Sequence, residues 1–265
     1  MTIKVSANLG FLWVNHSIPE AIKKASKFKF DAIEFHWPYD QEPDEIKEHS
    51  RNLGMDIITI NTPRGDVGGG DFGLAAIPGR EIEARRSIET SLSYASTIGA
   101  QHVHVMAGIT DHSCARDAFT SNLKFASELA KELSIGILIE PMNPKYVSGY
   151  FLTELNQAIS IINDLDTDNV KIIFDCYHLF EKNKSLLKAY ILASPHIGHI
   201  QFSSLPNRGA PNIGSIDFVS LLKKISELDY IGYFGAEYKP RDNIESELSW
   251  LGDFRKTWNL SVDNA

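Results

Sequence analysis

The feature of the sequence that most constrains its fold is a regular alternation between short apolar runs and longer amphipathic segments. The apolar runs are rich in β-branched residues, which is typical of buried strands. The segments between them, such as EAIKKASKF (20–28) and FVSLLKKISEL (218–228), space their apolar residues as one face of a helix does. The runs lie at residues 3–9, 31–35, 56–61, 102–106, 135–140, 170–175, 196–201 and 232–237.

Eight repeats of strand, helix and strand predict parallel strands joined by crossover helices. A closed (β/α)8 barrel accommodates eight such units in about 250 residues, and this chain has 265 residues. A doubly wound open sheet is the alternative, but no G-x-G-x-x-G loop follows the first run. Since no Pro/Gly/Ser-rich linker divides the chain, we expect residues 1–265 to form a single (β/α)8 TIM barrel.

Composition and charge argue against several classes of partner. The formal net charge of −8 disfavours a surface that tracks nucleic acid, which needs clustered Lys and Arg. No apolar run approaches the roughly 18 residues of a membrane-spanning helix, and the first residues lack the pattern of a secretory signal. Cys114 and Cys176 form no motif and are expected to be reduced thiols. We therefore expect a cytoplasmic protein that binds a small molecule, and the sequence leaves oligomerisation open.

Polar residues end most of the expected strands, at the face where (β/α)8 barrels carry their active sites. Glu140, Asp175, Gln201 and Glu237 end four consecutive strands. Side chains alternate between the two faces of a strand, so all four can point towards the barrel axis. The sequence thus predicts that three carboxylates and one amide oxygen converge there. The other four strands end at Asn8, Glu34, Asn61 and Met106.

Three neighbouring carboxylates need neutralisation, because like charges in a partly dehydrated site repel one another strongly. A divalent metal ion held by Glu140, Asp175, Gln201 and Glu237 would meet this need. Four oxygen ligands favour Mg²⁺ or Mn²⁺, since Ca²⁺ prefers more ligands. Zn²⁺ prefers imidazole, which the nearby histidines of these strands could supply.

Segments distributed over nearly the whole chain resemble the hydroxypyruvate isomerase family, whose members are TIM barrels related to xylose isomerase and to AP endonucleases. Each segment is a modest signal, and their order and spacing together are specific. The segments are SANLGFLW (6–13), DAIEFHWPYD (31–40), IPGREIEAR (77–85), VHVMAG (103–108), LIEPMN (138–143), FDCYH (174–178), GHIQ (198–201) and GAEYKPR (235–241).

The resemblance implies a metal site and a reaction. The family's metal ligands correspond to Glu140, Asp175, Gln201 and Glu237, the same four residues that end the strands. Its proton-transfer pair corresponds to Glu140 and Glu237. The implied reaction interconverts a 2-hydroxy aldehyde and its ketone, as in hydroxypyruvate and 2-hydroxy-3-oxopropanoate (tartronate semialdehyde), through an enediolate. Two glutamates on opposite sides of a planar intermediate suit this chemistry.

An acid substrate also needs a cation or hydrogen-bond donors. Lys239 lies two residues after Glu237, and Arg208 lies in the loop after Gln201. His178 follows Asp175 by three residues and can donate a hydrogen bond to substrate. We therefore expect His178, Arg208 and Lys239 to bind substrate.

Two further stretches are expected near the site. Residues 64–81 form a long glycine-rich segment without a P-loop motif, and a loop of this length is expected to close over the site. His36 and Trp37 follow the second strand, where an aromatic wall for the substrate and a plain packing cluster are equally plausible.

Other functions remain open from the sequence. A related isomerase or sugar epimerase would act on a longer acid such as a 2-oxo-tetronate. A barrel that binds metal or sugar acids without catalysis would keep the acids as anchors. A DNA-repair nuclease on the same fold would use several metals and a histidine-rich site, which the acidic charge disfavours.

Overall fold

The computed structural model describes residues 3–183, 185–241 and 243–259, and within these ranges eight parallel strands close into a barrel. Each strand pairs with its neighbours in sequence order, and β1 pairs with β8 to complete the ring. The predicted single (β/α)8 barrel is confirmed. The strands are β1 Val5–Asn8, β2 Ala32–Glu34, β3 Asp56–Asn61, β4 Ala100–His104, β5 Gly136–Ile139, β6 Val170–Asp175, β7 Ile197–Phe202 and β8 Phe234–Ala236.

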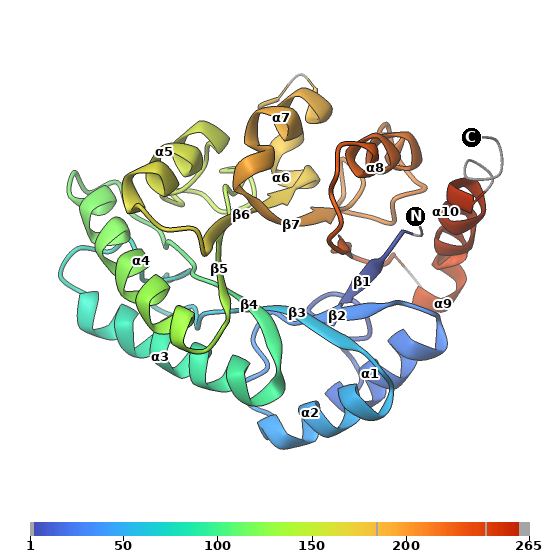
Figure 1. Cartoon of the computed structure of the whole chain (residues 1–265), viewed down its shortest axis with the longest axis horizontal. Helices are drawn as coiled ribbons and strands as arrows, with labels where there is room; N and C mark the ends of the chain where they lie inside the picture. The colour runs from blue at the N-terminus through green and yellow to red at the C-terminus, as the bar shows by residue number, and fades with distance from the viewer. Residues whose placement is uncertain (1–2, 184, 242, 260–265) are drawn as a thin grey trace.

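Helices surround the barrel and follow the strands in alternation (Figure 1). They bury their apolar faces against the outer face of the sheet, which explains the helical spacing of apolar residues. The helices are α1 Ile18–Lys27, α2 Pro43–Asn52, α3 Glu81–Ile98, α4 Ala115–Glu132, α5 Leu155–Leu165, α6 Cys176–Phe180, α7 Leu186–Ala193, the 3₁₀ turn η1 Ser194–His196, α8 Phe218–Glu227, α9 Ile244–Glu247 and α10 Ser249–Asn259.

Helix α1 begins where the sequence marks a helix start. The backbone N–H of Ser17 donates to the Glu20 carboxylate at 3.1 Å, which is one half of a capping box. Ala21, Ile22 and Ala25 then lie on the buried face of the helix. Local sequence and tertiary packing therefore specify the same helix.

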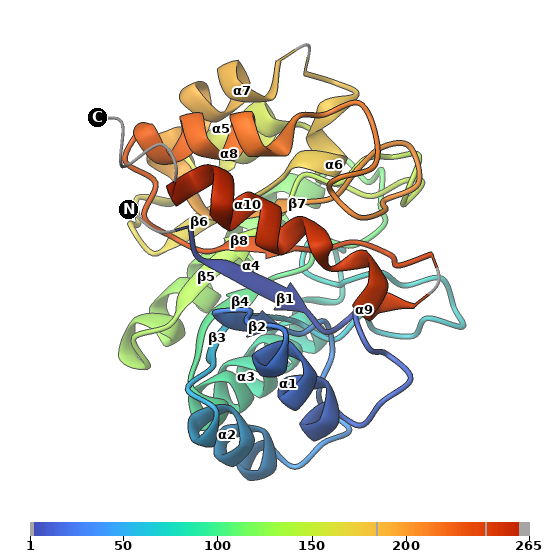
Figure 2. The ribbon, with the colours of Figure 1, turned by 90° about the vertical axis from the view of Figure 1, so that its right-hand side faces the viewer.

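Helix α10 covers the seam at which β8 meets β1, as Figure 2 shows. Trp250 packs edge-on against Phe202 of β7, with ring centroids 5.7 Å apart, and also against Phe30 at 6.2 Å. Such aromatic contacts add to the burial of a large apolar area. They hold the C-terminal helix against β7 and against the segment before β2, and so stabilise the closed ring.

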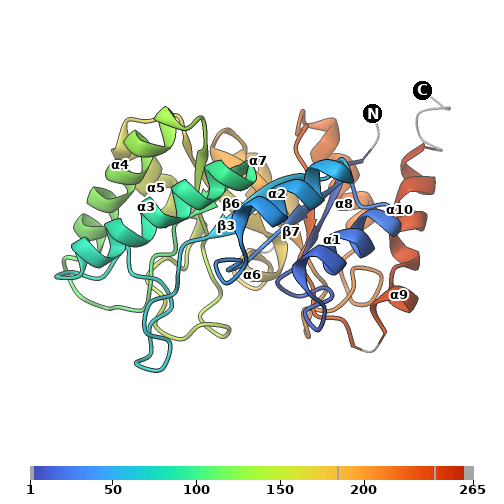
Figure 3. The same cartoon turned by 90° about the horizontal axis from the view of Figure 1, so that it is seen from below.

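Strand register aligns the carboxyl ends of neighbouring strands. Asp175 pairs with Gln201, and Gln201 pairs with Gly235. The long connections that follow these strands project from the same end of the barrel, including the cyan segment between β3 and α3 in Figure 3. The polar side chains and the loops that enclose them therefore meet at the carboxyl end of the sheet.

Two expectations from composition also have structural counterparts. Every helix within the described ranges is too short or too polar to cross a bilayer. Cys114 is exposed and Cys176 is buried, and both are free thiols.

Candidate active site

A pocket of about 210 Å³ lies at the carboxyl end of the barrel. Glu140 and Glu237 line it from the strand side, and Arg208 lines it from the loop after β7. Trp37 and Phe72 provide part of an aromatic wall. The volume is below the range of about 300–1,000 Å³ typical of drug-sized ligands, so the pocket suits a smaller molecule.

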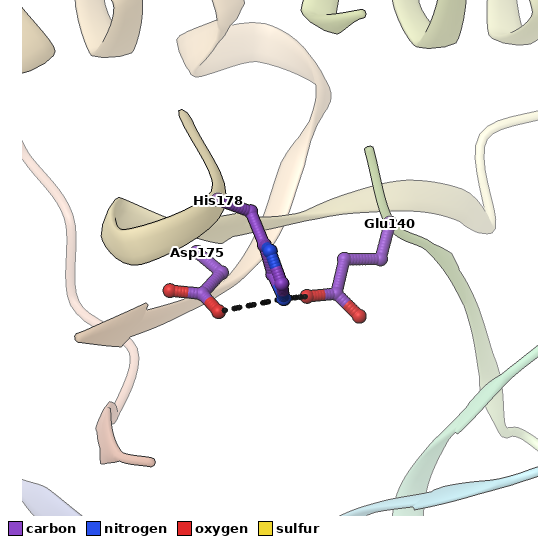
Figure 4. A group of neighbouring side chains, drawn as sticks. All are labelled: Glu140, Asp175 and His178. Carbon is purple, nitrogen blue, oxygen red and sulfur yellow. Dashed lines mark ion pairs between the residues drawn. The ribbon is translucent and has the colours of Figure 1, made fainter. Parts of the chain in front are cut away.

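Glu140, Asp175 and His178 form a tight, buried cluster on one side of the site. One ligand atom from each lies within 4.8 Å of the others. Figure 4 shows the His178 ring between the two carboxylates, with Nε2 at 3.7 Å from Glu140 Oε1 and 3.5 Å from Asp175 Oδ2. His178 stands here because α6 begins directly after β6, which turns its first helical turn over the strand end.

The hydrogen bonds of His178 define its role. Its Nδ1 accepts the backbone N–H of Asn143 at 3.2 Å. Burial and the nearby Arg208 guanidinium lower the pKa of His178 to about 3, so the ring is neutral and its proton resides on Nε2. Nε2 therefore points an N–H into the cluster and acts as a hydrogen-bond donor. A neutral imidazole in this tautomer is unsuited to bind a metal ion through Nε2.

Arg208 bridges two of the carboxylates. Its Nη2 donates to Glu237 Oε2 at 2.6 Å and to Asp175 Oδ2 at 3.1 Å. The guanidinium is buried among the rings of Phe11, Tyr146 and Tyr177, whose centroids lie at 4.9, 4.8 and 5.1 Å. These rings exclude water from the ion pairs, which strengthens them.

Both carboxylate oxygens of Glu237 have a partner. Besides Arg208, it contacts His36 Nε2 through Oε1 at 2.9 Å. Burial alone would raise the pKa of Glu237, but Arg208 and His36 outweigh it and lower the pKa to about 2. Glu237 is therefore ionised at neutral pH, with both carboxylate oxygens held in place.

Glu140 and Asp175 shift in the opposite direction. Burial raises the pKa of Glu140 well above its usual value, and the charges of Glu237 and Asp175 raise it further. Burial also raises the pKa of Asp175, to about 7, although Arg208 opposes the shift. One guanidinium faces three carboxylates, so the site has an excess of negative charge that either protons or a cation must neutralise.

A second polar layer lies beneath the acids, and we call it the Glu34 network: Glu34, Ser6, Asn8, His199 and Gln201. The Glu34 carboxylate is fully buried and accepts hydrogen bonds from Ser6 Oγ, from Asn8 Nδ2 at 3.5 Å and from Gln201 Nε2 at 2.8 Å, and it also lies 2.9 Å from His199 Nε2. Burial raises its pKa, but His199 and the other donors reverse the shift and lower it. The network thus holds an ionised glutamate inside the barrel.

The Glu34 network depends on the absence of a side chain in β8. A Cβ atom built on Gly235 would lie 2.3 Å from Glu34 Oε1 and 2.9 Å from His199 Nε2. Both distances are shorter than van der Waals contact, so only glycine leaves room for the carboxylate. This explains a glycine two residues before Glu237, in a strand interior where glycine is otherwise unfavourable.

The residues present fit a divalent metal ion bound through oxygen. Within the described part of the chain, Glu140 Oε1 and Gln201 Oε1 are buried acceptors without a hydrogen-bond partner. The Glu34 carboxylate holds the amide nitrogen of Gln201, which leaves Oε1 as the free atom of that side chain. Unpartnered buried oxygens beside surplus carboxylates are the donor set that Mg²⁺ or Mn²⁺ prefers.

Comparison with known proteins agrees with this geometry. Residues 22–254 match the family model described as xylose isomerase-like TIM barrel. The chain belongs to this family. It is 32% identical to the hydroxypyruvate isomerase of Escherichia coli over 96% of this chain and 100% of the relative. It is 33% identical to the 2-oxo-tetronate isomerase of Cupriavidus necator, over 94% of this chain and 97% of the relative.

The solved structures include a close match to this xylose isomerase-like barrel. A crystal structure described as AP endonuclease, family 2, from Brucella melitensis has a TM-score of 0.92 and 28% identity, and covers 96% of this chain and 100% of its own. The resemblance to hydroxypyruvate isomerases expected from the sequence is confirmed, and the curated relatives above are isomerases by name. The expected enzyme class agrees with these relatives.

Of the three residues expected to bind substrate, two lie in the site and the third does not line the pocket. Arg208 and His178 both lie inside the site, against the acids. Lys239 is exposed and does not belong to the pocket lining; its Nζ lies 5.5 and 5.4 Å from the ring centroids of Phe11 and Tyr146. Its role in substrate binding stays a prediction.

Three site features escaped sequence reasoning. Glu34 ended a strand like the other acids, yet it lies in the deeper layer and not in the pocket lining. His36 contacts Glu237, a pairing over 201 residues that no local pattern reveals. Arg64 lines the pocket from the segment expected to close over it. In the sequence, Arg64 is distinguished only as a charged residue in a glycine-rich segment.

Proposed function

We propose that the protein is a metal-dependent isomerase of short hydroxy-oxo acids that interconverts hydroxypyruvate and 2-hydroxy-3-oxopropanoate. The observation that carries the proposal is a small pocket lined by both Glu140 and Glu237, with Asp175 and Arg208 against them. The names of the curated relatives support this class of substrate.

The reaction moves a proton between adjacent carbons of the substrate through an enediolate. A carboxylate on one side removes the proton and a carboxylate on the other side returns it. Glu140 Oε1 has no hydrogen-bond partner in the described ranges, so it is free to hold a proton. Glu237 is fixed by His36 and Arg208, and each of its oxygens keeps a further lone pair for the substrate.

Glu140, Asp175, Gln201 and Glu237 would hold the metal ion, Mg²⁺ or Mn²⁺. When bound, the ion stabilises negative charge that develops on the substrate oxygens. His178 donates its Nε2–H towards the same space, where it can bind a substrate oxygen. The Arg208 guanidinium binds both Asp175 and Glu237 and so holds the two carboxylates beside the proposed substrate site.

Proton exchange with solvent tests the proposal. The protein is loaded with Mn²⁺ or Mg²⁺ and incubated with hydroxypyruvate in D₂O, and NMR follows the loss of signal from the C3 hydrogens. Enzyme-dependent exchange and the appearance of 2-hydroxy-3-oxopropanoate are expected. A chelator-treated sample gives the uncatalysed rate, and a loaded sample that does no better than this control contradicts the proposal.

The same assay separates the alternatives. A 2-oxo-tetronate offered in parallel tests the longer substrate, which the Cupriavidus necator relative suggests. If the longer acid turns over faster, the protein is a 2-oxo-tetronate isomerase. If calorimetry detects Mn²⁺ binding but neither acid exchanges protons, the protein is a non-catalytic metal-binding barrel.

A further inference from the structure

Arg64 lies on the wall of the pocket, stacked on Trp37. The guanidinium carbon is 4.1 Å from the centroid of the Trp37 ring, and both residues line the same cavity as Glu140 and Glu237. Arg64 comes from the connection between β3 and α3, whereas Glu140 directly follows β5 and Glu237 directly follows β8. A small molecule that fills the cavity therefore contacts Arg64 on one side and the two glutamates on the other.

Arg64 has no acidic partner among the described residues. No hydrogen bond or ion pair involves its side chain, although Arg80 of the same segment pairs with Asp71 at 2.7 Å and with Glu83 at 2.8 Å. The other arginine of the pocket lining, Arg208, already forms ion pairs with Asp175 and Glu237. Arg64 is thus the arginine in the lining whose donors are left for a ligand.

The surroundings fix Arg64 in a position to bind an anion. Its backbone carbonyl accepts the Gly73 N–H at 2.8 Å, and Trp37 Nε1 donates to the Thr62 carbonyl at 3.1 Å. Stacking occupies one face of the planar guanidinium, while its N–H groups lie in the plane and stay free. A planar carboxylate is the group that this fork of donors binds best.

We propose that Arg64 binds the carboxylate of the substrate, at the end that takes no part in proton transfer. The substrate would then be an anion that spans the cavity from Arg64 to Glu140 and Glu237, with its hydroxyl and carbonyl oxygens towards the glutamates. This inference rests on the proposed isomerase activity. It assigns recognition of the substrate carboxylate to Arg64, in addition to Arg208 and Lys239, which the sequence predicts as substrate-binding residues.

The first experiment compares Arg64→Ala, Arg64→Lys and wild type in the metal-loaded enzyme. Steady-state rates are measured for hydroxypyruvate and for dihydroxyacetone, in which a neutral hydroxymethyl group replaces the carboxylate. Loss of a charge-assisted contact is expected to raise KM for the acid about 10- to 100-fold in Arg64→Ala, with a smaller change in kcat. The values for dihydroxyacetone should stay close to wild type, and Arg64→Lys should recover part of the loss.

Arg86→Ala is the matched control, because it removes the same charge from an exposed position of α3 away from the pocket. It should leave both substrates unaffected. The inference is overturned if Arg64→Ala retains the wild-type preference for the acid, or if it weakens acid and neutral substrate equally. The latter result would assign Arg64 to the shape of the wall and not to charge recognition.

A second measurement does not depend on turnover. Calorimetric titration with pyruvate, a short oxo acid without the reacting hydroxyl group, is expected to show binding to wild type that weakens at least about tenfold in Arg64→Ala. If no acid is isomerised but this difference is found, the proposed function fails while the anion site stands. If acids are isomerised and pyruvate binds both proteins equally, Arg64 is not the anion site.

Discussion

The Gln201 amide nitrogen donates to the buried Glu34 carboxylate across 2.8 Å, and this bond sets the orientation of the amide. An ionised Glu34 can only accept hydrogen bonds, so it binds the amide nitrogen of Gln201, and Oε1 of Gln201 has no partner among the residues that the structure describes. The deeper layer of the barrel thus orients an oxygen of the candidate metal site.

Glu34→Gln is expected to weaken metal binding without removing any proposed ligand. The substituted amide no longer demands a donor, so Gln201 loses its fixed orientation. Outer contacts of this kind typically change metal affinity about 10- to 100-fold. Mn²⁺ titration of the chelator-stripped protein measures the change, with circular dichroism to show that the variant is folded. Glu83→Gln, the same substitution at an exposed site, should bind Mn²⁺ like wild type.

Glu140→Gln and Glu237→Gln are each expected to abolish most proton exchange. A positioned acid or base contributes about 10²- to 10⁴-fold to such a step, and glutamine can neither accept nor release the proton at neutral pH. Exchange in D₂O measures the loss at saturating Mn²⁺, and calorimetry establishes that the ion is bound. Near-normal exchange by either metal-loaded variant would remove that residue from the proton-transfer pair.

Metal affinity should rise with pH. The pKa of Glu140 is raised, and that of Asp175 is raised to about 7, so protons compete with the cation below these values. Increasing pH through this range removes the competing protons, and binding itself releases protons. Mn²⁺ titrations in two buffers of different ionisation enthalpy would detect the release. A pH-independent affinity with no proton release near neutrality would show that both acids are already ionised in the metal-free protein.

Glu140→Gln should stabilise the metal-free protein at neutral pH. Because the folded-state pKa of Glu140 lies above its unfolded value, the group costs stability once pH exceeds the unfolded pKa. Removing it should therefore raise the Tm of the metal-free protein. Saturating Mn²⁺ should reverse the order, because wild type keeps the better ligand. A lower Tm for the variant in both states would contradict this account.

Gly235→Ala should destabilise the barrel and weaken metal binding together. The added methyl group would displace Glu34 or His199, and overpacking of this kind costs about 1–3 kcal/mol. Denaturant unfolding and Mn²⁺ titration provide the two measurements. Gly252→Ala in α10 is the control, since no atom lies within 4 Å of its added Cβ and alanine favours a helix. Equal stability of the two variants would refute the steric explanation.

The sequence predicted the barrel and its polar end because both follow from periodic patterns. Period-two strands alternate with helices, and the register then places Asp175, Gln201 and Gly235 at one level. The same alternation assigns a face but no depth along the barrel axis. The pattern therefore predicts a strand end at Glu34 but not that its carboxylate lies deeper than the pocket, against Gln201 and His199.

Residues beyond a strand end are harder to place. The spacing of two residues after Glu237 makes Lys239 a candidate for substrate binding, but β8 ends at Ala236, so strand alternation does not extend to Lys239. Its side chain is exposed. His36 and Arg64 lie in connections, where tertiary contacts and not periodicity determine the direction of a side chain.

The origin of the cavity walls has a consequence for the diversity of such barrels. Arg64 belongs to the connection after β3, whereas Glu140, Asp175 and Glu237 belong to strand ends on the other half of the ring. If Arg64 binds the substrate carboxylate as proposed, exchange of that one connection between related proteins would alter which acids bind and leave Glu140 and Glu237 in place. New substrate preferences can then arise by replacing a single peptide segment, with the reaction inherited unchanged.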